Sequence, residues 1–222
     1  MSEYAVQNVS NGVGQKEKRI RENPAVNKAN QQLLDSARGG VNKFSWELTV
    51  EDRSFGATLA GQLAIKNIEL PNGIKIETTG FTGQGFGFCA VDGMTLRHTG
   101  FANDVVAGSM NGGKIILRLP EHLSRGDFEN SILGNSCAYG ATGGTLYADG
   151  AAGQRLGVRN SGAVIVARRA GKYAFEYMTA GIGVLLGSCH GVICAGMTGG
   201  KLFLMDEDNS VENKIDKQNV HV

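Results

Sequence analysis

The only local cluster of metal-binding residue types lies near the C-terminal end, where Cys189, His190 and Cys194 fall within six residues. Zinc and iron–sulfur clusters are held by thiolates and imidazoles. A closed zinc site usually takes two Cys or His pairs and a cluster takes four thiolates, whereas this segment offers C-x4-C with one adjacent histidine. We therefore expect buried, unreactive cysteines here and no bound metal, with a metal site at these three residues as the alternative.

A glycine motif of the kind found in phosphate-binding loops is formed by Gly83, Gly85 and Gly87. A dinucleotide-binding loop has the spacing G-x-G-x-x-G between a strand and a helix, so that the phosphate meets the helix N-terminus. Here the spacing is G-x-G-x-G, and the residues that follow, 88–96, indicate another strand and turn. We expect the motif to permit close backbone packing, with phosphate binding as the alternative.

No residue pattern typical of catalysis is present. The histidines show no H-x-x-x-H spacing and no serine stands in a G-x-S-x-G motif. A formal net charge of +1 gives no reason to expect a nucleic-acid partner, and no apolar run is long enough to cross a membrane. The polar start at residues 1–8 lacks the apolar core of a secretory signal, which predicts a cytoplasmic protein with reduced cysteines.

Internal repetition is the strongest pattern in the chain. Six glycines each open an apolar run: Gly93, Gly113, Gly144, Gly162, Gly181 and Gly200. Their successive gaps are 20, 31, 18, 19 and 19 residues, and the long gap contains a charged segment, 121–130, which we expect to be an inserted loop. A unit of about 19 residues is too short for a helix pair or a propeller blade, and it suits one coil of a parallel β-helix.

Such coils explain the high glycine content, 33 of 222 residues. Stacked at about 4.8 Å per coil, six to eight coils would make a rod of about 30–40 Å. Each coil turns sharply at the same places, where the backbone of the next coil lies close. The glycines that we expect to be intolerant of a side chain are Gly83, Gly85, Gly87, Gly112, Gly113, Gly143, Gly144, Gly199 and Gly200.

The segments outside the repeats divide the chain into three parts. Residues 1–47 contain a polar lead and an amphipathic helix at about 24–38, which we expect to cap the open end of the β-helix. The β-helix itself is predicted over 48–208, because Phe55–Ala64 is a near copy of the repeat that begins at Tyr139. Residues 209–222 are predicted to be a polar tail.

From about Asp52 to Asp208 the chain resembles the C-terminal G-x-G-x-G domain of the glutamate synthase large subunit. The matching segments are 52–61, 83–87, 102–106, 110–115, 132–144, 159–163, 176–181 and 195–200. The resemblance implies an all-β fold, a right-handed single-stranded parallel β-helix, which agrees with the 19-residue period. It also implies a domain without catalytic residues that braces an amidotransferase domain and an FMN-binding synthase domain.

The expected function is therefore that of a non-catalytic structural subunit of a glutamate synthase-like oxidoreductase complex in glutamate biosynthesis. The sequence has no catalytic cysteine at position 1 or 2 and no (β/α)8 pattern. We expect this chain to bind no cofactor by itself, and we expect FMN and an iron–sulfur cluster in its amidotransferase and synthase partners. Self-association stays open.

Two alternatives remain. The chain could be the scaffold C-type subunit of a formylmethanofuran dehydrogenase-like redox complex, which has a similar β-helix. It could also be a self-contained enzyme of the hexapeptide acyltransferase or γ-type carbonic anhydrase kind. The second alternative is disfavoured because the strict six-residue apolar period of those enzymes is missing.

Overall fold

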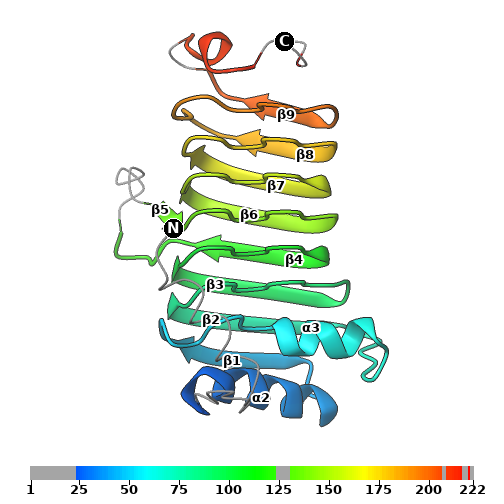
Figure 1. Ribbon diagram of the computed structural model, residues 1–222. Coiled ribbons are helices and arrows are strands. Elements are labelled where there is room, and N and C mark those ends of the chain that lie inside the picture. The colour runs from blue at the N-terminus through cyan, green and yellow to red at the C-terminus, as the bar shows by residue number, and fades with distance from the viewer. Residues whose placement is uncertain (1–23, 124–130, 207–208, 217–219, 221–222) are drawn as a thin grey trace, which may run out of the picture.

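The computed structural model describes residues 24–123, 131–206, 209–216 and 220. Within them one parallel sheet winds up the molecule as a stack of strands (Figure 1). The strands are β1 (Lys43–Leu48), β2 (Ile74–Thr82), β3 (Met94–Ala102), β4 (Asn111–Arg118), β5 (Ser131–Leu133), β6 (Gly143–Ala152), β7 (Ser161–Ala170), β8 (Ala180–Leu185) and β9 (Lys201–Leu204). The strands pair in parallel in the order β1-β2-β3-β4-β6-β7-β8-β9, with β5 beside β3 and β6, and this confirms the predicted parallel β-helix.

The strand register reproduces the repeat that the glycines predict. Met94 lies beside Ile74, Lys114 beside Thr95, Val164 beside Thr145 and Lys201 beside Ile182, so that one coil takes about 19 residues. Two coils are longer: Lys43 pairs with Lys75, and Lys114 pairs with Thr145. Each long coil carries an insertion and then returns to the common register.

The core is a column of side chains that point inward from equivalent positions in successive coils. Its members are Phe44, Ile76, Leu96, Ile115, Leu146 and Ile165, all buried and paired in register. In the next coil the column meets Gly183, where a Cβ would lie 2.7 Å from the Phe175 ring. Phe175, which is fully buried, and Leu202 therefore fill the space beside this glycine.

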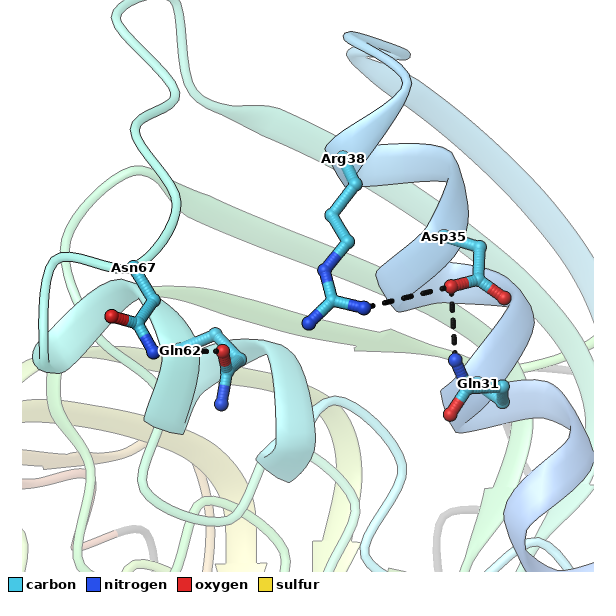
Figure 2. Close-up of polar contacts among 5 residues, drawn as sticks. All are labelled: Gln31, Asp35, Arg38, Gln62 and Asn67. Atoms are coloured by element: carbon cyan, nitrogen blue, oxygen red, sulfur yellow. Dashed lines mark hydrogen bonds and ion pairs between the residues drawn. The ribbon is translucent and has the colours of Figure 1, made fainter.

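The N-terminal end of the stack is covered by helix α2 (Pro24–Arg38), as the sequence predicts. Its apolar stripe, with Ala29, Leu33, Leu34 and Ala37, is buried in the core. On its solvent side the Gln31 amide donates to Asp35, and Asp35 lies 3.9 Å from Arg38 (Figure 2). The side chains of residues 24–27 and all of residues 1–23 fall outside the described set, and with them Val26 of the stripe and the polar lead.

One prediction for this region is wrong. Phe55–Ala64, which the sequence predicts to be another strand repeat, forms the helix α3 (Ala57–Ala64). The copy that begins at Tyr139 contains Gly143 and Gly144 before its apolar run, whereas Thr58 is followed directly by Leu59 and Ala60. Without the glycine pair the chain has no tight corner, and a run of Ala, Leu and Gln favours a helix that buries Leu59 and Ala60. The sheet itself begins with β1, which pairs with β2.

The second insertion separates two halves of one coil. After β4 the chain leaves the stack, residues 124–130 of the predicted loop lie outside the described residues, and β5 resumes the coil. Leu133 in β5 pairs with Ala102 below and Ala152 above. The insertion therefore lengthens the coil without interrupting the pairing of strands between coils.

The segment that follows β9 includes apolar residues that pack on the last coil. A short 3-10 helix, η1 (Val211–Asn213), places Val211 in a buried position, and Ile215 pairs with Ile193 of the last coil. Part of this segment thus packs against the C-terminal end of the stack.

Candidate docking surface

The paired glycines of the sequence motif lie where each coil turns into its first strand. Gly144 has φ +82°, and a Cβ there would lie 2.5 Å from the carbonyl oxygen of Gly112 in the preceding coil. The pairs Gly112–Gly113 and Gly199–Gly200 occupy the same corner, and each of these glycines also abuts the preceding coil. The intolerance of these positions to side chains stays a prediction, and this geometry is its physical basis.

The G-x-G-x-G segment lies in a different part of the coil. Gly85 and Gly87 have positive φ, and Gly83 packs against the carbonyl oxygen of Val50. The Gly85 amide donates to the backbone carbonyl of Asp104, and the Gly87 amide donates to that of Phe55. Both bonds therefore run between coils. Because these N–H groups already donate hydrogen bonds between coils, they are not free to bind a phosphate.

Equivalent segments in the next four coils repeat this backbone without requiring glycine. Residues at alternate positions have positive φ, in the triplets 85, 87, 89; 105, 107, 109; 136, 138, 140; 155, 157, 159; and 173, 175, 177. Their amides donate alternately to the coil above and the coil below, for example Ala107 to Phe86 and Ser109 to Tyr139. We call this stack of segments the turn ladder, and it closes the side of the rod that the strands leave open.

Polar side chains tie the coils together beside the turn ladder. The Asp104 carboxylate accepts the amide of Asn135, and the Asn135 side chain accepts the amide of Gln154 in the next coil. Asn160 is fully buried, and its side chain bonds the backbone of Ala163 in its own turn. Both side chains bond turn backbone, but only Asn135 bridges two coils.

The cysteines and His190 do not assemble into a ligand set. Cys189 and Cys194 are buried while His190 is exposed. Burial raises the pKa of the Cys194 thiol to about 12 and does the same for Cys137. Among the described residues no group of three Cys, His, Asp or Glu side chains could hold a metal ion. An iron–sulfur cluster needs four accessible thiolates, so the residues present here do not fit one.

The outer face of the sheet carries the most distinctive surface. Ile116, Tyr147, Val166, Val184 and Phe203 lie side by side in register on β4, β6, β7, β8 and β9. All are at least partly exposed, with Tyr147 at 40% and Phe203 at 55%, whereas the residues on either side of them in the sequence are buried or partly buried. We call these five residues the outer ladder. An apolar stripe of this length on a monomer is typical of an interaction site.

The same column of the sheet is polar toward the N-terminal end. Ser45, Glu77 and Arg97 continue the outer ladder in register on β1, β2 and β3. Around them lies a depression of about 540 Å³ lined mainly by polar residues, such as Glu47 and Arg118, and also by Trp46. The change from polar to apolar within one column marks the C-terminal half of this face as the part suited to burial.

Sequence reasoning did not identify the outer ladder. Its residues look like ordinary strand residues, because in a parallel β-helix the outward side chains also alternate with inward ones. Aligning the strands by the period would have brought the five residues into one column. None of the helices that the structure describes is long and apolar enough to cross a bilayer.

Comparison with known proteins agrees with this architecture. The GXGXG motif family matches residues 25–222. The chain is 44% identical over 178 residues to a ferredoxin-dependent glutamate synthase of Cyanidium caldarium, an alignment that covers 79% of this chain and 12% of that protein. It is 42% identical to ferredoxin-dependent glutamate synthase 2 of Synechocystis sp., covering 78% and 11%. With the NADH glutamate synthase of Schizosaccharomyces pombe the identity is 36%, covering 86% and 9%.

Proposed function

Because this chain belongs to the GXGXG motif family and is homologous to the C-terminal region of glutamate synthase large subunits, we propose that it is the non-catalytic scaffold of a glutamate synthase-like assembly. The chain spans about 12% of the length of a curated relative that it matches. The amidotransferase and FMN-binding synthase activities are accordingly assigned to partner chains. FMN and the iron–sulfur cluster belong to those partners as well.

The observation that carries this proposal is the outer ladder. A scaffold needs a rigid body and a surface that its partners cover. The in-register strands supply the first, and the five apolar residues supply the second. At about 4.8 Å per coil the outer ladder runs for about 20 Å along the rod, enough for the apolar centre of an interface with a polar rim. We propose that a partner chain of the assembly covers it.

The chemistry of the described residues supports a structural role. The buried thiols are held protonated by their raised pKa, and the amides of Gly85 and Gly87 are engaged between coils. At the outer ladder the chain presents shape and apolar area to a partner. Its contribution to the reaction is to hold catalytic parts at a fixed separation.

Co-expression with the amidotransferase and FMN-binding synthase chains of the same organism tests the proposal. Glutamine-dependent glutamate formation and co-purification are measured with the wild-type chain and with Val166→Lys, in the middle of the outer ladder. Ser45→Lys is the matched control, because it places the same side chain in the same column at the polar end. We expect Val166→Lys to lose the complex and Ser45→Lys to retain it.

Two results would contradict the proposal. The first is full activity of the amidotransferase and synthase pair in the absence of this chain. The second is a purified complex from the native host that contains pterin-dependent dehydrogenase subunits, which would favour the formylmethanofuran dehydrogenase-like alternative.

A further inference from the structure

Two arginine–tyrosine pairs stand on the turn ladder, away from the outer ladder. The Arg155 guanidinium lies 5.7 Å from the centre of the Tyr173 ring, and the Arg159 guanidinium lies 6.0 Å from that of Tyr177. In each pair the two residues are neighbours in adjacent coils. The backbone amide of Arg155 donates to the backbone carbonyl of Lys172, and that of Arg159 donates to the backbone carbonyl of Glu176. All four side chains are exposed. We call these four residues the Arg/Tyr patch.

The backbone of the patch is better suited to glycine than to the residues it has. All four residues have positive φ, between 54° and 66°, a conformation that side chains with a Cβ disfavour. Glycine occupies the equivalent position in the coils on either side of Arg159 and Tyr177, at Gly140 and Gly196. The fold therefore accepts glycine at this position, and backbone geometry does not account for the arginine and the tyrosine.

Apart from the tyrosine rings, the charges of the patch are not neutralised within the described part of the chain. Neither arginine has a carboxylate partner among the residues that the structure describes. Lys172 adds a third exposed cation, and Glu176 is the one carboxylate within this stretch of the two coils. In a chain whose formal net charge is +1, this is a local excess of positive charge. Arg and Tyr are also the residue types that dominate binding energy at protein interfaces.

We propose that the Arg/Tyr patch is a second docking surface, which binds an acidic surface of a partner protein through carboxylate–guanidinium bonds and contact with the tyrosine rings. This inference rests on the proposed scaffold function and extends it. Tyr147 and Val166 of the outer ladder belong to the same two coils as the patch, but to their strand side. One rod can thus hold two catalytic parts at the same height, one by apolar contact and one by charge.

An acidic protein fits these observations better than a nucleic acid. Binding to a phosphate backbone needs several cations spread along a groove and a basic domain. Here the cations are confined to two coils, and the whole chain is close to neutral. Complementary charge at an interface chiefly raises the association rate and makes it sensitive to salt.

The test uses the double variant Arg159→Gly/Tyr177→Gly, with Lys66→Gly as the matched control. Lys66 is likewise exposed at positive φ, 58°, and lies in the loop after α3. Relief of the backbone strain offsets the greater freedom of the unfolded chain, so we expect no fall in Tm for either variant. Binding to the purified amidotransferase and FMN-binding synthase chains is measured at low and high salt. We expect the double variant to weaken one of the two bindings by at least about tenfold and to flatten its salt dependence.

Each result decides something. No complex with the wild-type chain would overturn the scaffold function and this inference together. A complex that the double variant forms as well as wild type would overturn the inference alone, as would an equal loss with Lys66→Gly. A fall in Tm for the double variant without loss of binding would indicate a structural role for the pairs. Salt-sensitive binding of a fluorescent oligonucleotide, abolished by the double variant, would replace the acidic protein with a nucleic acid.

Discussion

Gly144 faces the carbonyl oxygen of Gly112 one coil below, at a distance that leaves no room for a side chain between them. A Cβ on Gly144 would lie 2.5 Å from that oxygen, and the backbone has φ +82°. We expect Gly144→Val to lower the free energy of unfolding by at least about 3 kcal/mol, since the substitution combines an unfavourable φ with overpacking. Denaturant unfolding measures this change.

Gly140→Ala is the control for that substitution. Gly140 also has positive φ, 64°, but the nearest atom that a Cβ there would meet is the Ser109 hydroxyl oxygen, at 3.8 Å. Gly140→Ala should lower the free energy of unfolding by only about 1 kcal/mol, because backbone strain is its only cost. Equal losses at the two positions would show that the close approach of the coils contributes nothing.

Asn30 joins the capping helix to the first coil. Its side chain accepts the Gly56 amide at 2.8 Å and donates to the Arg53 carbonyl at 3.2 Å, in a buried position. Asn30→Ala removes both bonds and should cost about 1–3 kcal/mol in unfolding free energy. Gln31→Ala, on the exposed side of the same helix (Figure 2), should change stability by less than about 0.5 kcal/mol. A small effect at Asn30 would mean that α2 is held by apolar contacts alone.

Phe86 and Phe81 both stack on another aromatic ring but differ in burial. Phe86 is fully buried against Phe55, with ring centres 5.9 Å apart, and Phe81 is 57% exposed beside Phe101. Phe86→Ala should cost about 3–5 kcal/mol, because it opens a cavity in the core. Phe81→Ala should cost no more than about 1.5 kcal/mol, the contribution of the ring pair. Thermal unfolding of the two variants gives the comparison.

His98 makes stability depend on pH. Its ring is fully buried, with Nδ1 3.0 Å from the Thr78 hydroxyl and Nε2 3.3 Å from the Phe101 carbonyl. Desolvation lowers the pKa of His98 below its ordinary value. The unfolded chain takes up a proton near pH 6.5 and the folded chain only at lower pH, so the stabilisation is complete above about pH 6.5 and is lost as the pH falls below it.

The measurement is the free energy of unfolding between about pH 5 and 7. We expect His98→Gln to flatten the dependence on pH in this range, although the variant is less stable overall. His122→Gln, at an exposed position, should leave the slope as it is in the wild type. A wild-type slope that survives His98→Gln would assign the titration to other groups.

Local sequence determined most of the architecture. The period of the glycines anticipated the coil length, the apolar stripe of 24–38 anticipated α2, and the charged segment after β4 marked the place where the chain leaves the stack. These features depend on short-range requirements, because a corner needs glycine and a cap needs an amphipathic helix. The error at Phe55–Ala64 arose where two nearly identical sequences differ by a glycine pair, and that pair decides between a corner and a helix.

Tertiary structure alone decided which residues share a surface. Ile116 and Phe203 stand 87 residues apart in the chain, yet they belong to one column because the register of four strand pairs carries one to the other. The positive φ of Arg159 and Tyr177 is likewise imposed by hydrogen bonds to neighbouring coils, against the local preference of both residues. Sequence thus determined the coil, and stacking of the coils determined the two surfaces through which we propose that this chain acts.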